Sequence, residues 1–210
     1  MKFPTHGLYA VTQTDGKSAE AVVAEVAAAL RGGAALVQYR DKNPADALFL
    51  ARELVKLCHR HDVPLIINDD VELAARAGAD GVHLGREDGA IARARMLLGN
   101  DAIIGVSCYD CVERALDAQA QGATYAAFGR FFPSSSKPLA APARIETLQQ
   151  AKRLLTLPII AIGGILPENG APLLAAGADF LAVIGGLFDS QPEQSARAYQ
   201  VLFNRRDRAS

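Results

Sequence analysis

Short apolar runs alternate with alanine-rich stretches of helical periodicity eight times along this chain. We expect strands at residues 8–12, 36–39, 65–68, 81–84, 103–107, 125–129, 159–162 and 180–184. We expect helices at 18–31, 44–61, 71–77, 89–98, 110–121, 144–155, 167–176 and 191–203. Asn43 and Pro44 predict the start of the second helix, as an N-cap followed by proline at the first helical position.

This alternation limits the folds that the chain can adopt. Strands that alternate with helices form a parallel sheet with the helices outside it. Eight such units predict an α/β fold, a closed (β/α)8 TIM barrel. An open doubly wound sheet is the alternative, but it needs fewer strands and a switch point. We expect a single barrel domain over residues 1–203 and a polar C-terminal tail over 204–210.

A finer repeat supports the same division of the chain. A glycine followed by alanine stands just before each even-numbered strand, and each such glycine is expected to close a helix in the left-handed conformation. These glycines are Gly33, Gly78, Gly122 and Gly177. Two odd-numbered strands are instead entered through Pro64 and Pro158.

Composition excludes several classes of function. The chain has 22 Lys and Arg against 23 Asp and Glu, which argues against nucleic acid as a partner. The start of the chain has no secretory apolar region, and Pro158 and Gly163 break the longest apolar stretch, so we expect no membrane partner. Three cysteines, an odd number, indicate a reducing, cytoplasmic setting. Small molecules remain as partners.

Two neighbouring strands run into acidic residues at their C-terminal ends. Asp69 and Asp70 follow the third strand, and Asp88 follows the fourth. Adjacent parallel strands lie about 4.8 Å apart, so Asp69 and Asp88 could reach one hard cation. The alternative is that these aspartates cap the helices that follow them. In the barrel, Asp70 is the expected cap, and Asp69 with Asp88 the expected Mg²⁺ pair.

Cations and glycines are expected at the same end of the barrel, where active sites of this fold lie. Arg40, Lys42 and Lys137 could bind a Mg²⁺-diphosphate there, although each alone could be a solvated surface residue. Diglycines follow strands seven and eight at 163–164 and 185–186, where this fold commonly binds phosphate; tight turns are the alternative.

Other polar residues give weaker signals. The serine run at 134–136 either donates to a second phosphate or forms a plain loop. Cys108 and Cys111 are expected to be structural thiols rather than a redox or metal pair. His83 is expected to line the site from within a strand, whereas His59 and His61 lie at the opposite end of the barrel. No Ser-His-Asp order points to acyl transfer.

Taken together, six motifs resemble the thiamine phosphate synthase family over essentially the whole chain. They are Val37-Gln38-Tyr39-Arg40-Asp41-Lys42, Ile67-Asn68-Asp69-Asp70, His83-Leu84-Gly85-Arg86-Glu87-Asp88, Gly105-Val106-Ser107-Cys108, Phe132-Pro133-Ser134-Ser135-Ser136-Lys137-Pro138 and Ile162-Gly163-Gly164-Ile165.

The resemblance implies a transferase that joins hydroxymethylpyrimidine diphosphate to hydroxyethylthiazole phosphate, with Mg²⁺ as cofactor. It implies that the pyrimidine diphosphate is held by Gln38, Tyr39, Arg40, Asp41, Lys42, Asn68, Ser107 and Lys137. Among these, Arg40, Lys42, Ser107 and Lys137 would be catalytic. Asp69 and Asp88 would bind Mg²⁺. The thiazole phosphate would be held by Ser134, Ser135, Ser136, Gly164, Ile184 and Gly185.

Two rival functions remain at this point. A thiazole tautomerase with the same barrel needs a proton-transferring histidine but no diphosphate or metal residues, so Asp69, Asp88, Arg40 and Lys42 favour the synthase. A non-catalytic barrel that binds a phosphate ligand is the other rival, because a fold does not fix a function. The sequence leaves open whether the chain forms a homo-oligomer.

Overall fold

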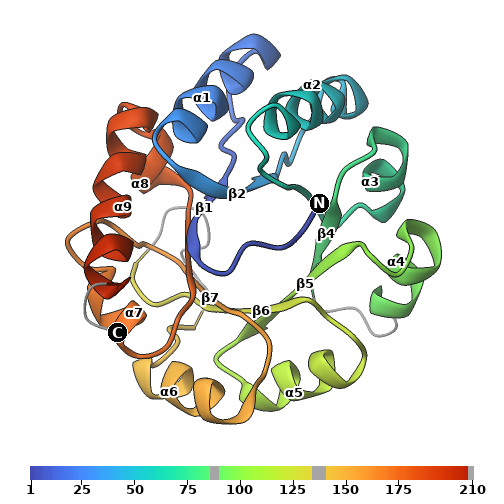
Figure 1. Cartoon of the computed structure of the whole chain (residues 1–210). Helices are drawn as coiled ribbons and strands as arrows, with labels where there is room; N and C mark the ends of the chain where they lie inside the picture. The colour runs from blue at the N-terminus through green and yellow to red at the C-terminus, as the bar shows by residue number, and fades with distance from the viewer. Residues whose placement is uncertain (86–89, 134–140, 208–210) are drawn as a thin grey trace.

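The computed structural model describes residues 1–85, 90–133 and 141–207 and contains a closed barrel of parallel strands in chain order. The barrel prediction is therefore correct. Figure 1 looks along the barrel, with the helices forming a ring around the strands. The strands are β1 (Gly7–Val11), β2 (Ala34–Tyr39), β3 (Leu65–Asn68), β4 (Gly81–Leu84), β5 (Ile103–Tyr109), β6 (Tyr125–Gly129), β7 (Ile159–Ile162) and β8 (Phe180–Val183).

The outer ring consists of the helices expected from the sequence and one short addition. They are α1 (Ala19–Arg31), α2 (Ala47–His59), α3 (Val71–Ala77), α4 (Ala90–Leu98), α5 (Val112–Ala120), α6 (Ile145–Leu154), α7 (Ala171–Ala175), α8 (Gly185–Phe188) and α9 (Pro192–Asp207). The short helix α8, directly after β8, was not predicted. Helix α9 continues through Asp207, past residue 203 where the last helix was expected to end.

The predicted start of α2 is wrong. The helix begins after Asp46, whose side chain accepts a hydrogen bond of 2.9 Å from the backbone N–H of Phe49. An aspartate at this position satisfies one of the free N–H groups of the first turn. Asn43 instead donates its N–H to Asp41, so the Asn43-Pro44 pair belongs to the loop and not to the helix.

Side chains of the strands separate into an inner and an outer layer, as their alternation requires. The inner layer consists of Tyr9, Val11, Leu36, Ile66, Ile103, Tyr125, Ala127, Ile160, Phe180 and Ala182. Phe3 packs against this layer, with its ring centroid 5.2 Å from those of both Tyr125 and Phe180. Figure 1 shows the N-terminal segment, which carries Phe3, crossing the barrel.

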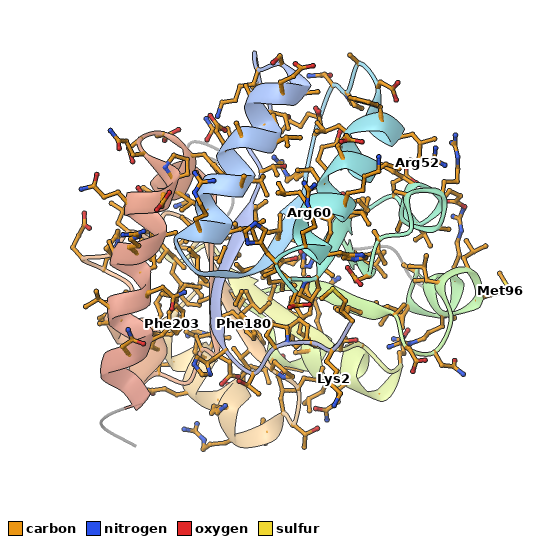
Figure 2. All side chains as sticks on the ribbon, turned by 45° about the horizontal axis from the view of Figure 1, so that its top comes forward. Lys2, Arg52, Arg60, Met96, Phe180 and Phe203 are labelled. Atoms are coloured by element: carbon orange, nitrogen blue, oxygen red, sulfur yellow. The ribbon has the colours of Figure 1, made fainter. Side chains whose placement is uncertain are left out.

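The outer layer joins the barrel to its helices. Figure 2 labels Phe203, which lies on α9 and is 1% exposed. It also labels Met96, which projects from α4 into solvent and is 78% exposed. Within the part of the chain that the structure describes, every helix is too short or too polar to cross a bilayer.

The glycine repeat marks a recurring clamp at the N-terminal ends of the strands. Gly78 and Gly177 adopt positive φ angles of 73° and 113°, as predicted. The aspartate two residues later accepts the first N–H of the preceding odd strand: Asp80 from Leu65 and Asp179 from Ile159, each at 2.9 Å. The repeat therefore ties pairs of strands together at the end of the barrel opposite the predicted site.

Candidate active site

A pocket of about 630 Å³ lies at the C-terminal ends of the strands, and each of the eight strands contributes to its lining. The volume falls within the range of small-molecule sites. The strands contribute apolar side chains such as Val11 and Ile160, and charged residues also line the pocket, including Arg40, Lys42, Asp69, Arg130 and Asp189. The pocket can therefore hold an organic ring below and an anion above.

Most of the residues singled out from the sequence converge here. Those that line the pocket are Gln38, Arg40, Asp41, Lys42, Asn68, Asp69, His83, Ser107, Gly164, Ile184 and Gly185. Asp88, Ser134, Ser135, Ser136 and Lys137 lie outside the described residues. The structure thus brings together residues from three predicted sets: those expected to bind the pyrimidine diphosphate, the metal ion and the thiazole phosphate.

Tyr39 is the exception among the described residues. Its side chain points away from the barrel interior and packs in the outer layer, 3% exposed. The hydroxyl donates to Asp41 at 3.4 Å. Strand alternation explains this placement, because Gln38 and Arg40, its neighbours in sequence, line the pocket. Tyr39 therefore supports the Asp41 loop and does not line the predicted binding site.

The backbone of Arg40 is held by a threonine on the neighbouring strand. The hydroxyl of Thr12 donates to the Arg40 carbonyl and accepts from the Arg40 N–H, both at 2.9 Å. Thr12 is only 2% exposed, and its own N–H donates to the carbonyl of Gln38 at 2.9 Å. The end of β1 therefore fixes the point at which the cationic loop leaves β2.

Asp70 is a helix cap, as the sequence predicted, whereas Asp69 is not the cap of this helix. Asp70 caps α3 by accepting the N–H of Leu73 at 2.8 Å. Asp69 adopts a left-handed φ of 61°, and its N–H donates to the carbonyl of His83 at 2.8 Å. Its carboxylate accepts from the side-chain amide of Asn68 at 2.8 Å. This arrangement orients the Asp69 carboxylate toward the pocket and away from the helix.

The oxygen donors around Asp69 fit a hard divalent cation. Mg²⁺ needs only one or two protein carboxylates, with phosphate and water completing its shell. Across residues 1–85, 90–133 and 141–207, no three His, Cys, Asp or Glu side chains gather as a metal-binding group.

The glycines after β7 allow a close approach between two loops. A Cβ at Gly163 would lie 2.3 Å from the Cβ of Arg130, and one at Gly164 would lie 2.3 Å from the carbonyl oxygen of Pro133. Both glycines also have positive φ angles, 105° and 63°. These observations support the tight-turn interpretation, and the two glycines bring the loop after β6 against the loop after β7 beside the pocket.

A chain of hydrogen bonds crosses the barrel interior below the mouth. Gln38 donates through Nε2 to the hydroxyl of Tyr9 at 2.7 Å, and the hydroxyls of Tyr9 and Tyr125 lie 2.8 Å apart. The Tyr125 hydroxyl lies 2.9 Å from Nδ1 of His83, and Nε2 of His83 lies 2.9 Å from Oγ of Ser107. His83 thus lines the site, as predicted.

The sequence interpretation missed Tyr9 and Tyr125, the two tyrosines of this hydrogen-bond chain. The signal available was Gly105, a glycine inside a strand, which often marks close packing by a neighbour. A Cβ there would lie 1.9 Å from the Tyr125 ring, so Gly105 makes room for that ring. Arg130 and Asp189 also line the pocket without having been singled out as site residues.

The cysteines and remaining histidines have structural positions. Cys58 and Cys108 are free and buried, and Cys111 is free and half-buried. Burial raises the pKa of the Cys58 and Cys108 thiols to about 12. His59 pairs with Asp80 at 2.9 Å at the opposite end of the barrel, as expected.

Comparison with known proteins gives consistent results. A model of the family described as thiamine monophosphate synthase matches residues 8–187. The thiamine-phosphate synthase of Marinobacter nauticus is 52% identical over 204 residues, covering 95% of this chain and 91% of the relative. That of Methylococcus capsulatus is 50% identical, covering 97% and 92%. A solved thiamine phosphate pyrophosphorylase from Pyrococcus furiosus superposes with a TM-score of 0.86 at 30% identity, covering 96% of both chains.

Proposed function

Since the chain belongs to the thiamine monophosphate synthase family, we propose that its pocket joins hydroxymethylpyrimidine diphosphate to hydroxyethylthiazole phosphate, with Mg²⁺ bound at the mouth. The chain is a transferase, a thiamine-phosphate synthase.

One observation carries this assignment: the cations Arg40 and Lys42 line the same pocket as the Asp69 carboxylate and the polar pair Gln38 and Ser107. A diphosphate carries more charge than a single cation neutralises, so it requires several positive groups at one place. An aminopyrimidine requires donors and acceptors in an otherwise apolar wall. The pyrimidine diphosphate has both requirements, with its diphosphate at the mouth and its ring in the interior of the pocket.

The residues present fit Mg²⁺, and we assign Asp69 and Asp88 to it. The Asp69 carboxylate is exposed at the pocket and is oriented by Asn68. Gly85 lies beside it: a Cβ at Gly85 would be 3.5 Å from Oδ1 of Asp69, and the chain continues from there to Asp88. When bound, the ion would neutralise charge on the diphosphate oxygens.

The chemistry asks for charge stabilisation and alignment more than for acid–base catalysis. The bond between the pyrimidine methylene carbon and the diphosphate breaks, and the aminopyrimidine ring stabilises the carbocation that remains. Arg40, Lys42 and Lys137 bind the departing diphosphate, with the Arg40 backbone held by Thr12. Asn68 and Ser107 complete the pyrimidine site. The thiazole nitrogen then forms the new bond to the carbon.

The thiazole phosphate is assigned to the glycine loops after β7 and β8. Gly164, Ile184 and Gly185 line the pocket, and the short helix α8 starts there. The loops after these two strands and a short extra helix are where barrels of this kind often bind phosphate. Ser134, Ser135 and Ser136 are assigned as further donors to the same group. The apolar wall between the two sites aligns the rings.

The tautomerase alternative is disfavoured by the environment of His83. Both of its ring nitrogens lie 2.9 Å from hydroxyls within the barrel, those of Tyr125 and Ser107. A histidine that transfers a proton to substrate needs one nitrogen directed at the substrate.

We also place the enzyme in the cytoplasm, since Cys58 and Cys108 are free thiols.

The test supplies both substrates with Mg²⁺ to the purified protein and measures thiamine phosphate and diphosphate by chromatography. We expect the two products in equal amounts, and none when Mg²⁺ is removed by a chelator. A folded protein that gives no product would refute the substrate assignment. Product formation unaffected by chelation would instead refute the metal assignment alone.

A further inference from the structure

The buried hydrogen-bond chain joins two walls of the pocket that are far apart in sequence. It runs from Gln38 on β2 through Tyr9, Tyr125 and His83 to Ser107 on β5. Four of these residues also line the pocket, whereas Tyr125 is fully buried beneath it. The groups expected to contact the pyrimidine ring, Gln38 and Ser107, are therefore the two ends of one network.

The amide donor at one end sets the first bond of this hydrogen-bond chain, and full use of the hydroxyl protons within it gives the direction of the others. An amide NH₂ can only donate, so the Tyr9 oxygen accepts from Gln38. Either hydroxyl can donate in the Tyr9–Tyr125 pair; the arrangement that uses both protons within the hydrogen-bond chain has Tyr9 donating to Tyr125 and Tyr125 donating to Nδ1 of His83. A neutral imidazole with Nδ1 accepting carries its proton on Nε2 and donates to the Ser107 oxygen. The hydroxyl proton of Ser107 then remains for the pocket.

Burial of the two tyrosines keeps their hydroxyls protonated and preserves the hydrogen-bond chain. Tyr9 is 1% exposed and Tyr125 is 0% exposed. Desolvation raises the pKa of both hydroxyls, so each retains its single proton over the range in which enzymes work. The His83 ring also stacks on that of Tyr125, with centroids 5.6 Å apart and planes inclined by 20°, which restricts rotation of the imidazole.

We propose that Tyr9, Tyr125 and His83 are positioning residues that transmit the orientation of the Gln38 amide to the Ser107 hydroxyl. They hold His83 as the neutral Nε2–H tautomer. The Gln38 amide oxygen is thereby presented as an acceptor and the Ser107 hydroxyl as a donor. This pattern complements an aminopyrimidine edge, which offers amino protons and a ring nitrogen; this last step rests on the proposed function.

The first test measures the tautomer of His83 without substrate. The chain has four histidines, and ¹⁵N labelling of histidine distinguishes protonated from unprotonated ring nitrogens by NMR. The His83 signals are identified by their loss in His83→Asn. We expect one neutral tautomer with the proton on Nε2. A proton on Nδ1, a doubly protonated ring at pH 8 or an even mixture of tautomers would overturn the proposal.

The second test reverses the network from its far end. In Gln38→Glu at pH 9 the carboxylate can only accept, so every bond should reverse and the His83 proton should move to Nδ1. Adding Tyr125→Phe removes the link, so the tautomer should no longer depend on residue 38. An unchanged tautomer in Gln38→Glu, or the same dependence with and without the Tyr125 hydroxyl, would contradict transmission through this chain.

The third test measures the effect of breaking the hydrogen-bond chain on the kinetics of the enzyme. Tyr125→Phe leaves Gln38 and Ser107 in place but should lower kcat/KM for the pyrimidine diphosphate about tenfold, with KM for the thiazole phosphate unchanged. Tyr199→Phe is the matched control, because it removes another buried hydroxyl, 2.9 Å from the carbonyl of Ile165, outside the chain. An equal loss in both variants would assign the effect to packing and overturn the proposal.

The experiments distinguish a failure of the proposed function from a failure of the network proposal. If the protein made no thiamine phosphate, the proposed function would fall, but the dependence of the His83 tautomer on residue 38 would still be measurable. If turnover were normal and the tautomer were independent of residue 38, the network proposal alone would fall.

Discussion

Replacing Thr12 by valine should disturb the active site from outside it. Thr12 does not line the pocket, but its hydroxyl makes two hydrogen bonds of 2.9 Å with the backbone of Arg40. Valine has nearly the same shape and lacks the hydroxyl. The substitution therefore removes what fixes Arg40 while it leaves the barrel packing in place.

The expected loss of stability follows from those two bonds. Each is worth about 0.5–1.5 kcal/mol net. Because Thr12 is 2% exposed while Arg40 is half-buried, water can replace only part of the loss, so we expect a decrease of about 2 kcal/mol in the free energy of unfolding. For a chain of this length that corresponds to a fall in Tm of roughly 4–8 °C.

The expected loss of activity is larger than the loss of stability suggests. A displacement of about 1 Å in a positioned group can cost up to about 100-fold in rate. We therefore expect kcat/KM for the pyrimidine diphosphate to fall between about 10-fold and 100-fold in Thr12→Val, measured below its melting temperature. Thr12→Ser retains the hydroxyl and should recover most of the activity. Equal losses in the serine and valine variants would refute the role of the hydroxyl.

Three further predictions concern other parts of the molecule. Asp69→Ala should lower Mg²⁺-dependent turnover by at least about 100-fold, and an unchanged Mg²⁺ titration would reject Asp69 as a ligand. Asp179→Ala should lower the free energy of unfolding by about 1–3 kcal/mol in urea, because the buried N–H of Ile159 loses its acceptor; Asp179→Asn keeps an acceptor and should lose less. The thiols of Cys58 and Cys108 should resist labelling in the native state and react after unfolding. Since their pKa is raised to about 12 by burial, deprotonation favours the unfolded chain, and stability present below about pH 9 should fall as the pH rises toward 12.

The fold could be predicted from local signals because each unit of the barrel repeats the same ones. The eight strand predictions agree with the structure to within two residues at every end, and the helix-closing glycines have the expected positive φ angles. The start of α2 was misplaced because Asp46 competes with Asn43 as a cap, and only Asp46 accepts from the first turn. Helix α8 was missed because two glycines at its start read as a turn.

The pocket was predicted less completely, for a geometric reason. Strand ends could be assigned to the mouth, which brought Arg40 and Asp69 to the right place. Residues that reach the pocket from the middle of a strand depend on the alternation of the whole barrel. Tyr9 and Tyr125 therefore escaped notice, and the side chain of Tyr39, which the resemblance implied to be part of the site, packs in the outer layer.

The aromatic layer around Phe3 makes the pocket a well with a closed floor, and this affects the order of events during turnover. Within the described residues the pocket lies at the strand ends, so we expect substrates and products to pass there. Gln38 and Ser107 connect directly to the buried tyrosines, whereas Gly164 and Gly185 lie in the loops at the rim. The pyrimidine should therefore enter before the thiazole phosphate, and a bound thiazole phosphate should delay the entry of the next pyrimidine.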